Sequence, residues 1–367
     1  LPFGLFDGGD PENLWNYLAG YEEVTCGQAL AIPHNGNLSN GLMFSDSMPS
    51  GEKITRAYAE KRNRWEPLHE VTQIKGDEEA HPLLSPEDEF ADFETWDTSN
   101  IAGSAPKQDE MLEHEYARSA LKLGLELGHD LGANPYKFGM IGASDTHTAL
   151  STTREDNFFG KYQHTEPSPD RHNGEVIPAS DPDLRILTSQ ESASGLSAVW
   201  ARENTREAIF NALKRKEVYA TTGTRLRVRV FAGWEFEADD LSRHDFTEYG
   251  YRNGVPMGGD LSSAPRDQAP RFLIRALRDP DGANLDRIQV IKGWIDKKGK
   301  AHERIYDVAV SGDRKIGKDG RARQPVGSTV NIEKATYTNT IGAAMLGAHW
   351  EDPEFDPQQD AFYYVRV

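Results

Sequence analysis

The chain has 367 residues, 37% hydrophobic and 27% charged, an ordinary globular composition for a protein large enough to form two domains. Its 59 acidic and 41 basic residues give a formal net charge of −18, so we expect neither nucleic acid nor a membrane surface as a partner. No apolar run approaches the roughly 20 residues of a membrane-spanning helix, and a single cysteine, Cys26, excludes an internal disulfide.

Both ends of the sequence look cut. The chain opens at Leu1 without a methionine and closes on residues 361–367, an apolar and aromatic run typical of a strand. We therefore expect a processed product or one piece of a longer, soluble protein. The compartment stays open, although removal of an upstream signal peptide would favour a periplasmic or secreted protein over a cytoplasmic one.

The first predicted helix begins after Asp10, because an aspartate cap followed by a first-turn proline is typical of a helix start. Apolar residues then recur at helical spacing, at Leu14, Trp15, Leu18 and Tyr21. This helix leads to an apolar strand predicted at residues 29–33, which ends at His34.

A second group of elements follows the same order. Residues 70–74 predict a short strand, and an amphipathic helix is expected from Leu112 to about Gly128. That helix precedes an apolar strand at residues 138–143. Repeated helix–strand units favour a parallel sheet or a barrel, with the site in the loops after the strands.

The middle of the chain is less regular. Residues 151–190 have no sustained period, which indicates a long loop serving as a lid or an oligomer contact. Asn204 and Glu207 form a plausible capping box for a helix that ends near Lys216, and residues 218–222 predict a strand.

From about residue 225 the apolar period changes to two. Arg225, Arg227 and Arg229 alternate with apolar residues, which predicts a half-buried antiparallel strand with a solvated arginine face. Further strands are expected at residues 272–278, 288–294 and 304–310. The predicted organisation is an α/β domain at 1–224 and a mainly antiparallel, β-sandwich-like domain at 225–367.

Candidate metal ligands follow the first-domain strands. Asp145 and His147 are two residues apart and share one face of an extended segment, and His34 follows an earlier strand in the same way. We therefore predict that the three converge on one site. Ordinary turn or hydrogen-bonding roles are the competing interpretation, most of all for His34.

Glu70 and His81 are weaker candidates for catalysis. Glu70 opens a predicted strand, where a carboxylate can bridge cations or orient an imidazole, whereas His81 lies in an acidic segment typical of an exposed loop. The sequence lacks the GxGxxG, GxxxxGK[ST], GxSxG and HExxH motifs, so dinucleotide, P-loop, serine-hydrolase and zincin chemistry lose support.

Several motifs in order resemble those of a known family. They are residues 32–37 (IPHNGN), 70–77 (EVTQIKGD), 81–84 (HPLL), 144–148 (SDTHT) and 218–223 (VYATTG). Along nearly the whole chain the sequence resembles the family catalogued as domain of unknown function 3604, within the PHP (polymerase and histidinol phosphatase) superfamily.

The resemblance implies a distorted (β/α)7 barrel of which this chain is a part, followed by the β-domain. It implies divalent metal ions, zinc, manganese or iron, two or three in a complete site, with His34, Asp145 and His147 among the ligands. The superfamily's first His-x-His motif and the Asp-His motif after it are absent from this sequence. Those ligands are expected upstream of Leu1, in a missing N-terminal segment of the same protein.

The leading hypothesis is a metal-dependent hydrolase of small phosphate, phosphonate or sulfate esters that uses a metal-activated water. An amidohydrolase-like enzyme acting on amides or lactones would share the ligands. The alternative from another class is a non-catalytic binding protein whose β-domain uses Trp234, Trp294 and Trp350 as aromatic platforms. A homo-oligomer is compatible with each hypothesis.

Overall fold

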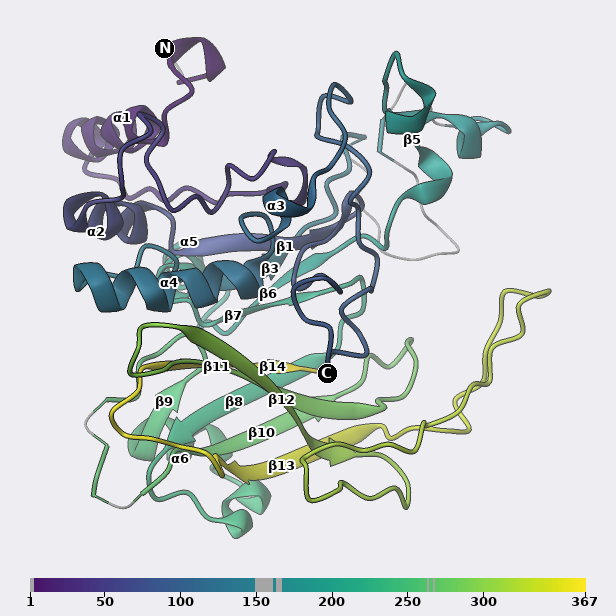
Figure 1. Ribbon diagram of the computed structural model, residues 1–367. Coiled ribbons are helices and arrows are strands. Elements are labelled where there is room, and N and C mark those ends of the chain that lie inside the picture. Colours follow the sequence, from purple (N-terminus) through teal and green to yellow (C-terminus); the bar gives the residue numbers. More distant parts are fainter. Residues whose placement is uncertain (1–2, 149–160, 163–166, 263, 267) are drawn as a thin grey trace. The chain divides into compact units, whose positions relative to one another are not determined.

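The computed structural model describes residues 3–148, 161–162, 167–262, 264–266 and 268–367. The chain divides into two compact units, unit 1 (Leu1–Gly223) and unit 2 (Thr224–Val367) (Figure 1). None of the helices in the described ranges is both long and apolar enough to cross a membrane.

Unit 1 mixes helices with short strands. Its α-helices are α1 (Pro11–Thr25), α2 (Arg56–Trp65), α3 (Asp109–Leu112), α4 (Ala117–Leu131) and α5 (Arg206–Lys214). Its strands are β1 (Leu68–Gln73), β2 (Gly76–Asp77), β3 (Gly139–Gly142), β4 (Glu175–Ile177), β5 (Ile186–Leu187), β6 (Leu196–Val199) and β7 (Val218–Thr221). Its 3₁₀ turns are η1 (Leu5–Asp7), η2 (Gly36–Leu38), η4 (Arg171–Asn173), η5 (Pro182–Leu184) and η6 (Thr188–Gln190).

The centre of unit 1 is a parallel pair of strands, β1 and β3, connected through α4. β2 extends this pair into a three-stranded sheet of order β2-β1-β3, and β6 pairs with β7 antiparallel. Leu68, Ile141 and Val218 pack together, so β7 shares a core with the parallel pair. The predicted α/β class is confirmed, but the described strands of unit 1 do not close into a barrel.

Of the predicted helix starts, one is confirmed and two are wrong. At α5 the N-cap is Thr205, whose hydroxyl accepts from the Ala208 N–H at 3.3 Å, and not the predicted Asn204. Asp10 caps α1 as predicted, its carboxylate accepting from the Glu12 N–H at 2.9 Å. The single helix predicted from Leu112 is wrong, because it is broken into α3 and α4 at Tyr116, which has extended backbone angles. The break lets the first N–H groups of α4 donate to the carbonyls of residues 78 and 79 (2.8 and 3.0 Å), a tertiary contact that the local pattern does not encode.

The strand predicted at residues 29–33 is also wrong. The segment is extended and lies beside β1, since Ala31 N–H donates to Trp65 O at 2.8 Å and Glu70 N–H donates to Pro33 O at 3.1 Å. It is not assigned as a strand. Proline has no N–H to give to a ladder, which limits pairing at Pro33.

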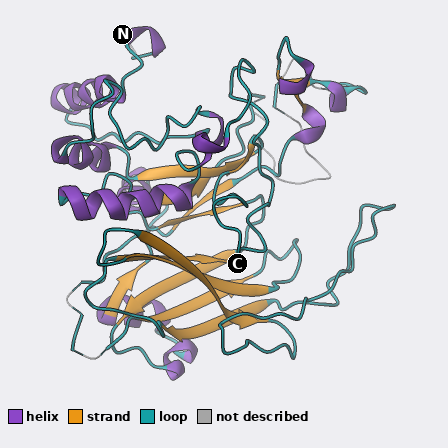
Figure 2. Cartoon of the chain, viewed as in Figure 1, coloured by secondary structure: helices purple, strands orange, loops and turns teal. Residues whose placement is uncertain are grey.

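Unit 2 is mainly antiparallel, as predicted. One sheet has the order β13-β10-β8-β9 and the other β12-β11-β14. Figure 2 draws the strands in orange. Its elements are β8 (Arg227–Gly233), η7 (Ala238–Ser242), α6 (Phe246–Asn253), β9 (Gly254–Pro256), β10 (Arg271–Leu277), β11 (Arg287–Ile295), β12 (Ala301–Val310), β13 (Met345–Glu351) and β14 (Ala361–Arg366). Of these, η7, α6, β9 and β13 were not predicted from the sequence.

Aromatic side chains from the two sheets meet in the unit 2 core. Phe272 of β10 lies 4.9 Å from Tyr363 of β14, and Trp350 of β13 lies 5.1 Å from Tyr306 of β12, between ring centroids. The solvated arginine face predicted for β8 is wrong at Arg229, which is buried and donates to Tyr251 Oη at 2.6 Å. The aromatic ring accommodates the guanidinium through a cation–π contact.

The long loop predicted at 151–190 is described only in part. Residues 149–160 and 163–166 lie outside the described residues. The described part of this loop contains three short 3₁₀ turns and the antiparallel pair β4–β5.

The hairpin after β1 carries a pH-sensitive group. Burial, and then the charge of Glu79, raises the pKa of Asp77 from 3.8 to about 7. An acid with a higher pKa in the folded chain than in the unfolded chain makes stability fall as pH rises between those two values. The free energy of unfolding should therefore decrease between about pH 4 and pH 7.

We predict that Asp77→Asn removes this decrease, making the protein more stable than wild type by roughly 1 to 3 kcal/mol at pH 8 but not at pH 4. Urea unfolding at both pH values measures the difference. Equal pH dependence in the two proteins would contradict the prediction.

Candidate functional site

Three segments of unit 1 bring polar side chains to the carboxyl edge of the β1–β3 pair. Because the two strands are parallel, their carboxyl ends lie at the same edge. The two-residue turn between β1 and β2 presents Lys75, and the loop after β3 presents Asp145 and His147. The segment that ends at His34 joins them, since the Pro33 carbonyl accepts a backbone hydrogen bond of 3.1 Å from β1.

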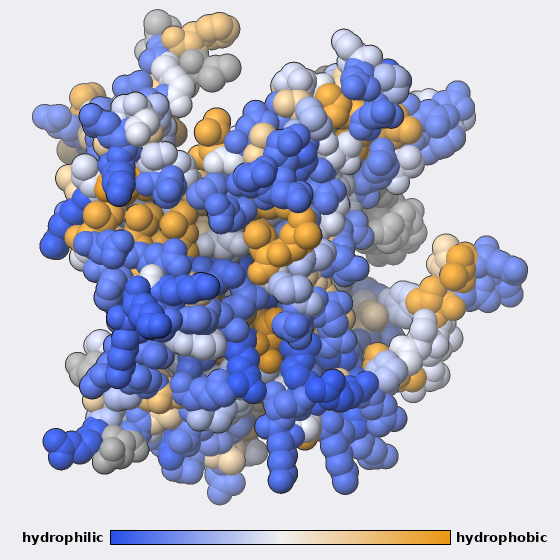
Figure 3. Space-filling model, viewed as in Figure 1, coloured by the Kyte–Doolittle hydropathy of each residue, from blue (hydrophilic) through white to orange (hydrophobic). Residues whose placement is uncertain are grey.

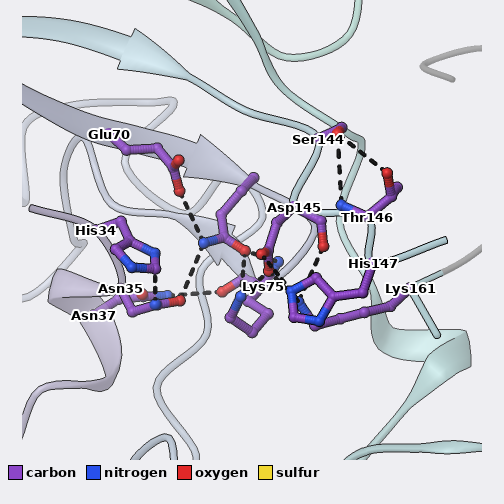
Figure 4. A network of polar contacts seen from close by, with 11 residues as sticks. His34, Asn35, Asn37, Glu70, Lys75, Ser144, Asp145, Thr146, His147 and Lys161 are labelled. Atoms are coloured by element: carbon purple, nitrogen blue, oxygen red, sulfur yellow. Dashed lines mark hydrogen bonds and ion pairs between the residues drawn. The ribbon is translucent and has the colours of Figure 1, made fainter. Parts of the chain in front are cut away.

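A chain of side-chain hydrogen bonds connects these segments (Figure 4). Lys75 Nζ donates to Gln73 Oε1 at 2.6 Å. Gln73 Nε2 donates to Asn35 Oδ1 at 3.0 Å and to Glu70 Oε1 at 2.9 Å. Asn35 Nδ2 contacts His34 Nδ1 at 2.8 Å, so His34 and Lys75 belong to one network.

Asp145 is shared by two lysines. Its Oδ2 accepts hydrogen bonds from both Lys75 and Lys161, and Lys161 also donates to the Asp145 carbonyl oxygen at 3.0 Å. The side chains of Lys75, Lys161 and Asp145 are 7%, 3% and 12% exposed. When both lysines are protonated, the two ammonium groups on one carboxylate leave one excess positive charge in this cluster, and burial strengthens its attraction for an anion.

His147 lies at the rim of the lysine pair. Its side chain is 52% exposed, and its Nε2 is 3.3 Å from Asp145 Oδ1 and 3.3 Å from Lys161 Nζ. The backbone holds it there, because His147 N–H donates to Lys161 O at 2.7 Å. An imidazole nitrogen therefore stands beside the two ammonium groups, within reach of a ligand from solvent.

The charged members of the network fix the direction of its hydrogen bonds. The Lys75 ammonium can only donate, so Gln73 turns its oxygen to Lys75 and its amide N–H groups to Glu70 and Asn35. Asn35 then accepts with its oxygen and donates to Nδ1 of His34. Neutral His34 must carry its proton on Nε2, a tautomer assigned from the network.

Two residues of the network have left-handed backbone conformations. The φ angles of Asn35 and Asp145 are 57° and 51°. Asparagine and aspartate adopt this region more readily than other non-glycine residues. The same two positions thus need a short polar side chain both for the turn of the backbone and for the hydrogen bonds.

The surroundings shift several pKa values. Burial and the charge of Lys75 lower the pKa of His34, and burial and the charge of Lys161 lower that of His147, so both imidazoles are neutral at pH 7. Burial and the neighbouring ammonium of Lys161 lower the pKa of Lys75. Burial raises the pKa of Glu70.

The residues fit a divalent metal ion only in part. Asp145 Oδ1 and His147 Nε2 lie close enough together to ligate one ion, and both are ordinary ligand types. Within the described ranges, however, no three His, Cys, Asp or Glu side chains lie close enough to share an ion. The Nδ1 of His34 is engaged by Asn35, and the second Asp145 oxygen is engaged by the lysines.

The two residues predicted for catalysis lie in different places. Glu70 is 9% exposed and joins the network through Gln73. Among the hydrogen bonds of the described residues, none joins His81 to the network. Its Nε2 pairs with Asp97 Oδ2 at 3.2 Å, and its Nδ1 accepts from the Leu83 N–H at 3.2 Å. Both ring nitrogens of His81 thus have structural partners in its own loop.

Sequence reasoning missed four members of the network. Asn35, Gln73 and Lys75 stand within or next to the motifs already noted, so polar residues at a strand end gave a usable signal for them. For Lys161 the sequence gave no signal, because this residue lies in a loop without hydrophobic periodicity and contacts Asp145 only in the folded chain.

The comparison with protein families identifies the chain. A family model described as protein of unknown function (DUF3604) matches residues 1–367. The chain belongs to this family. No curated protein and no solved structure matches it. The family resemblance seen in the motifs is confirmed, and the DUF3604 description itself names no activity or substrate.

We predict that His34 is protonated on Nε2 at pH 8, and that Asn35→Ala removes this preference by deleting the donor to Nδ1. Nitrogen-15 NMR of the imidazole distinguishes the two tautomers. In the same titration, Lys75→Met should raise the pKa of His34 while leaving it below 6.5, since burial is the larger cause of the shift. A wild-type His34 protonated mainly on Nδ1 would contradict the assigned direction of the network.

Proposed function

We propose that this chain supplies part of the active site of a metal-dependent hydrolase that cleaves small phosphate, phosphonate or sulfate esters. One observation carries the proposal: two buried lysines converge on Asp145 beside His147, at the carboxyl edge of a parallel strand pair. Sites of α/β folds lie at this edge. We also propose that this chain contains a fragment of a PHP-like distorted barrel.

The lysine pair explains how an acidic protein could hold an anionic ester. With a net charge of −18 the surface repels anions at long range. Lys75 and Lys161 supply ammonium groups at the site itself, where low exposure strengthens their interaction with an anion. An oxygen of the ester's anionic group would accept hydrogen bonds that the two lysines otherwise donate to Asp145.

Asp145 and His147 would hold a divalent ion, zinc, manganese or iron, which when bound supplies a water of lowered pKa for hydrolysis. His34 would need to be released from Asn35 to ligate through Nδ1. The resemblance to PHP proteins supports, as part of this proposal, further ligands and a second or third ion held by a His-x-His segment that this sequence does not contain.

The chain's own residues would perform two further tasks. Lys75 and Lys161 would orient the anionic group and balance the charge that develops on it. Gln73 would keep Lys75 and Asn35 in fixed orientations through its hydrogen bonds.

The alternatives receive less support. An amide or lactone has no anionic group to match the excess positive charge of the lysine pair. For a binding protein with aromatic platforms, Trp350 would have to leave the contacts it makes with Phe272 and Tyr306 in unit 2. Trp234 and Trp294 are half-buried, and Trp294 stacks on His302 with ring centroids 5.5 Å apart.

We predict that Asp145→Asn, which keeps the shape but removes the negative charge, weakens metal retention and lowers ester turnover by about 100-fold or more. Turnover of 4-nitrophenyl phosphate and 4-nitrophenyl sulfate, before and after chelation, tests activity. Elemental analysis of the purified protein gives the metal content.

Asp130→Asn on the exposed end of α4 is a matched control, and it should leave both quantities unchanged. An active wild type that is insensitive to chelation and to Asp145→Asn would refute the metal mechanism. If the chain alone is inactive, titration with Zn²⁺ or Mn²⁺ still tests the ligand assignment. Equal affinity of wild type and Asp145→Asn would contradict it.

A further inference from the structure

Lys292 and Asp352 form a buried pair that joins the two sheets of unit 2. Hydrophilic residues cover most of the molecular face drawn in Figure 3, but these two side chains are only 3% and 0% exposed. Lys292 lies in β11 of one sheet, and Asp352 directly follows β13 of the other. The atoms Nζ and Oδ2 are 2.6 Å apart. An amine and a carboxyl group from different sheets thus meet where water has little access.

This contact lacks the alignment of a hydrogen bond. Lys292 Nζ donates to the Glu354 carbonyl oxygen at 2.8 Å, and Asp352 Oδ2 accepts from Tyr363 Oη at 2.6 Å. Among the hydrogen bonds of the described residues, none joins Lys292 to Asp352. The nitrogen of Lys292 therefore touches the carboxyl group without being oriented as its donor.

The carboxyl group of Asp352 is polarised at both oxygens. Tyr363 Oη donates to Oδ2, and the Glu354 N–H donates to Oδ1 at 3.0 Å. Fixed donors of this kind stabilise the negative charge that develops on oxygen when a nucleophile adds to the carbon. Strand pairing places Tyr363 of β14 opposite Lys292 of β11, so the donor and the amine reach the same carboxyl group from neighbouring strands. Burial and the charge of Asp352 raise the pKa of Tyr363, which keeps its hydroxyl protonated.

The surroundings of the pair disfavour separate charges. Lys292 Nζ lies 5.2 Å from the ring centroid of Trp294 and 6.0 Å from that of Tyr363. Two buried charges are costly to desolvate, whereas an amide carries no charge. A folded chain that holds two reacting groups in contact also gives an effective concentration of roughly 10⁵–10⁸ M in well-oriented cases. Both effects favour condensation of the amine with the acid.

We propose that Lys292 and Asp352 are joined in the folded protein by an intramolecular amide bond. The Lys292 ammonium first passes one proton to the carboxylate. The electron pair of the nitrogen then forms a bond to Asp352 Cγ, and the bond from Cγ to one oxygen breaks. That oxygen leaves as water, with the transferred proton and a second proton from the nitrogen. The reaction requires no oxidant and no other reactant.

The amide would link the two sheets of unit 2 covalently. The single cysteine of the chain excludes an internal disulfide, so this bond would be a covalent link of another kind. It would close a loop that contains β12 and β13. The inference concerns unit 2 alone and is independent of the hydrolase proposed above.

The mass of the intact full chain tests the proposal. Under denaturing conditions, wild type should lie one water, about 18 Da, below the mass calculated from its sequence. Trypsin does not cleave after an acylated lysine, so the digest should contain residues 288–297 joined to residues 335–366. A chain of full mass would overturn the proposal. Loss of water without the branched peptide, as from an aspartyl succinimide, would overturn it too.

Two variants assign the bond to its lysine. Lys292→Met should have the full mass calculated for its own sequence. Lys107→Met is a matched control that should still lack one water, because Lys107 is a buried lysine that donates to both oxygens of Glu115, at 2.8 and 2.7 Å, as an ordinary ion pair. Loss of water from Lys292→Met would contradict the assignment. The wild-type mass decides the proposal without any variant that must fold.

Tyr363→Phe tests the chemistry, since it removes the donor to Asp352 and keeps the ring. In chains newly made by cell-free translation, the linked fraction should rise at least about tenfold more slowly than in wild type. Mass spectrometry follows the linked fraction, and circular dichroism shows whether the variant keeps the fold. An equal rate in folded Tyr363→Phe would overturn the role given to Tyr363.

Discussion

The carboxylate of Asp145 is the interaction on which the candidate site depends. It joins the loop after β3 to the turn after β1 through Lys75, and to Lys161, 16 residues further along the chain. Two buried ammonium groups next to each other repel, which together with burial lowers the pKa of Lys75 to about 6, and the carboxylate between them offsets part of this repulsion. The same carboxylate therefore organises the local fold and sets the charge that an anionic ligand would meet.

Local patterns predicted the parts of unit 1 whose causes are local. The Asp10 cap, the apolar strands now seen as β1 and β3, and the polar residues that follow them are all encoded by neighbouring residues. The geometry places His34, Glu70 and Asp145 in one hydrogen-bond network. Three side chains close enough to share one metal ion were predicted, but the described residues contain no such group.

The features that the sequence did not predict depend on contacts between residues far apart in the chain. Lys75 and Asp145 are 70 residues apart, so no window of sequence shows that they pair. The break before α4 results from carbonyls near residue 78, and Arg229 is buried because Tyr251 accepts a hydrogen bond from its guanidinium and packs over it. In each case a tertiary partner outweighed the periodic pattern.

The distribution of charge favours small anions over large ones. At physiological ionic strength the surface charges that produce −18 are screened beyond about 8 Å, whereas Lys75 and Lys161 are buried and are screened much less. Under the proposed function, a small ester would place its one anionic group at the lysine pair. A polymer such as nucleic acid would keep most of its phosphates near the acidic surface, so attraction at the lysine pair would be offset by repulsion along the remainder.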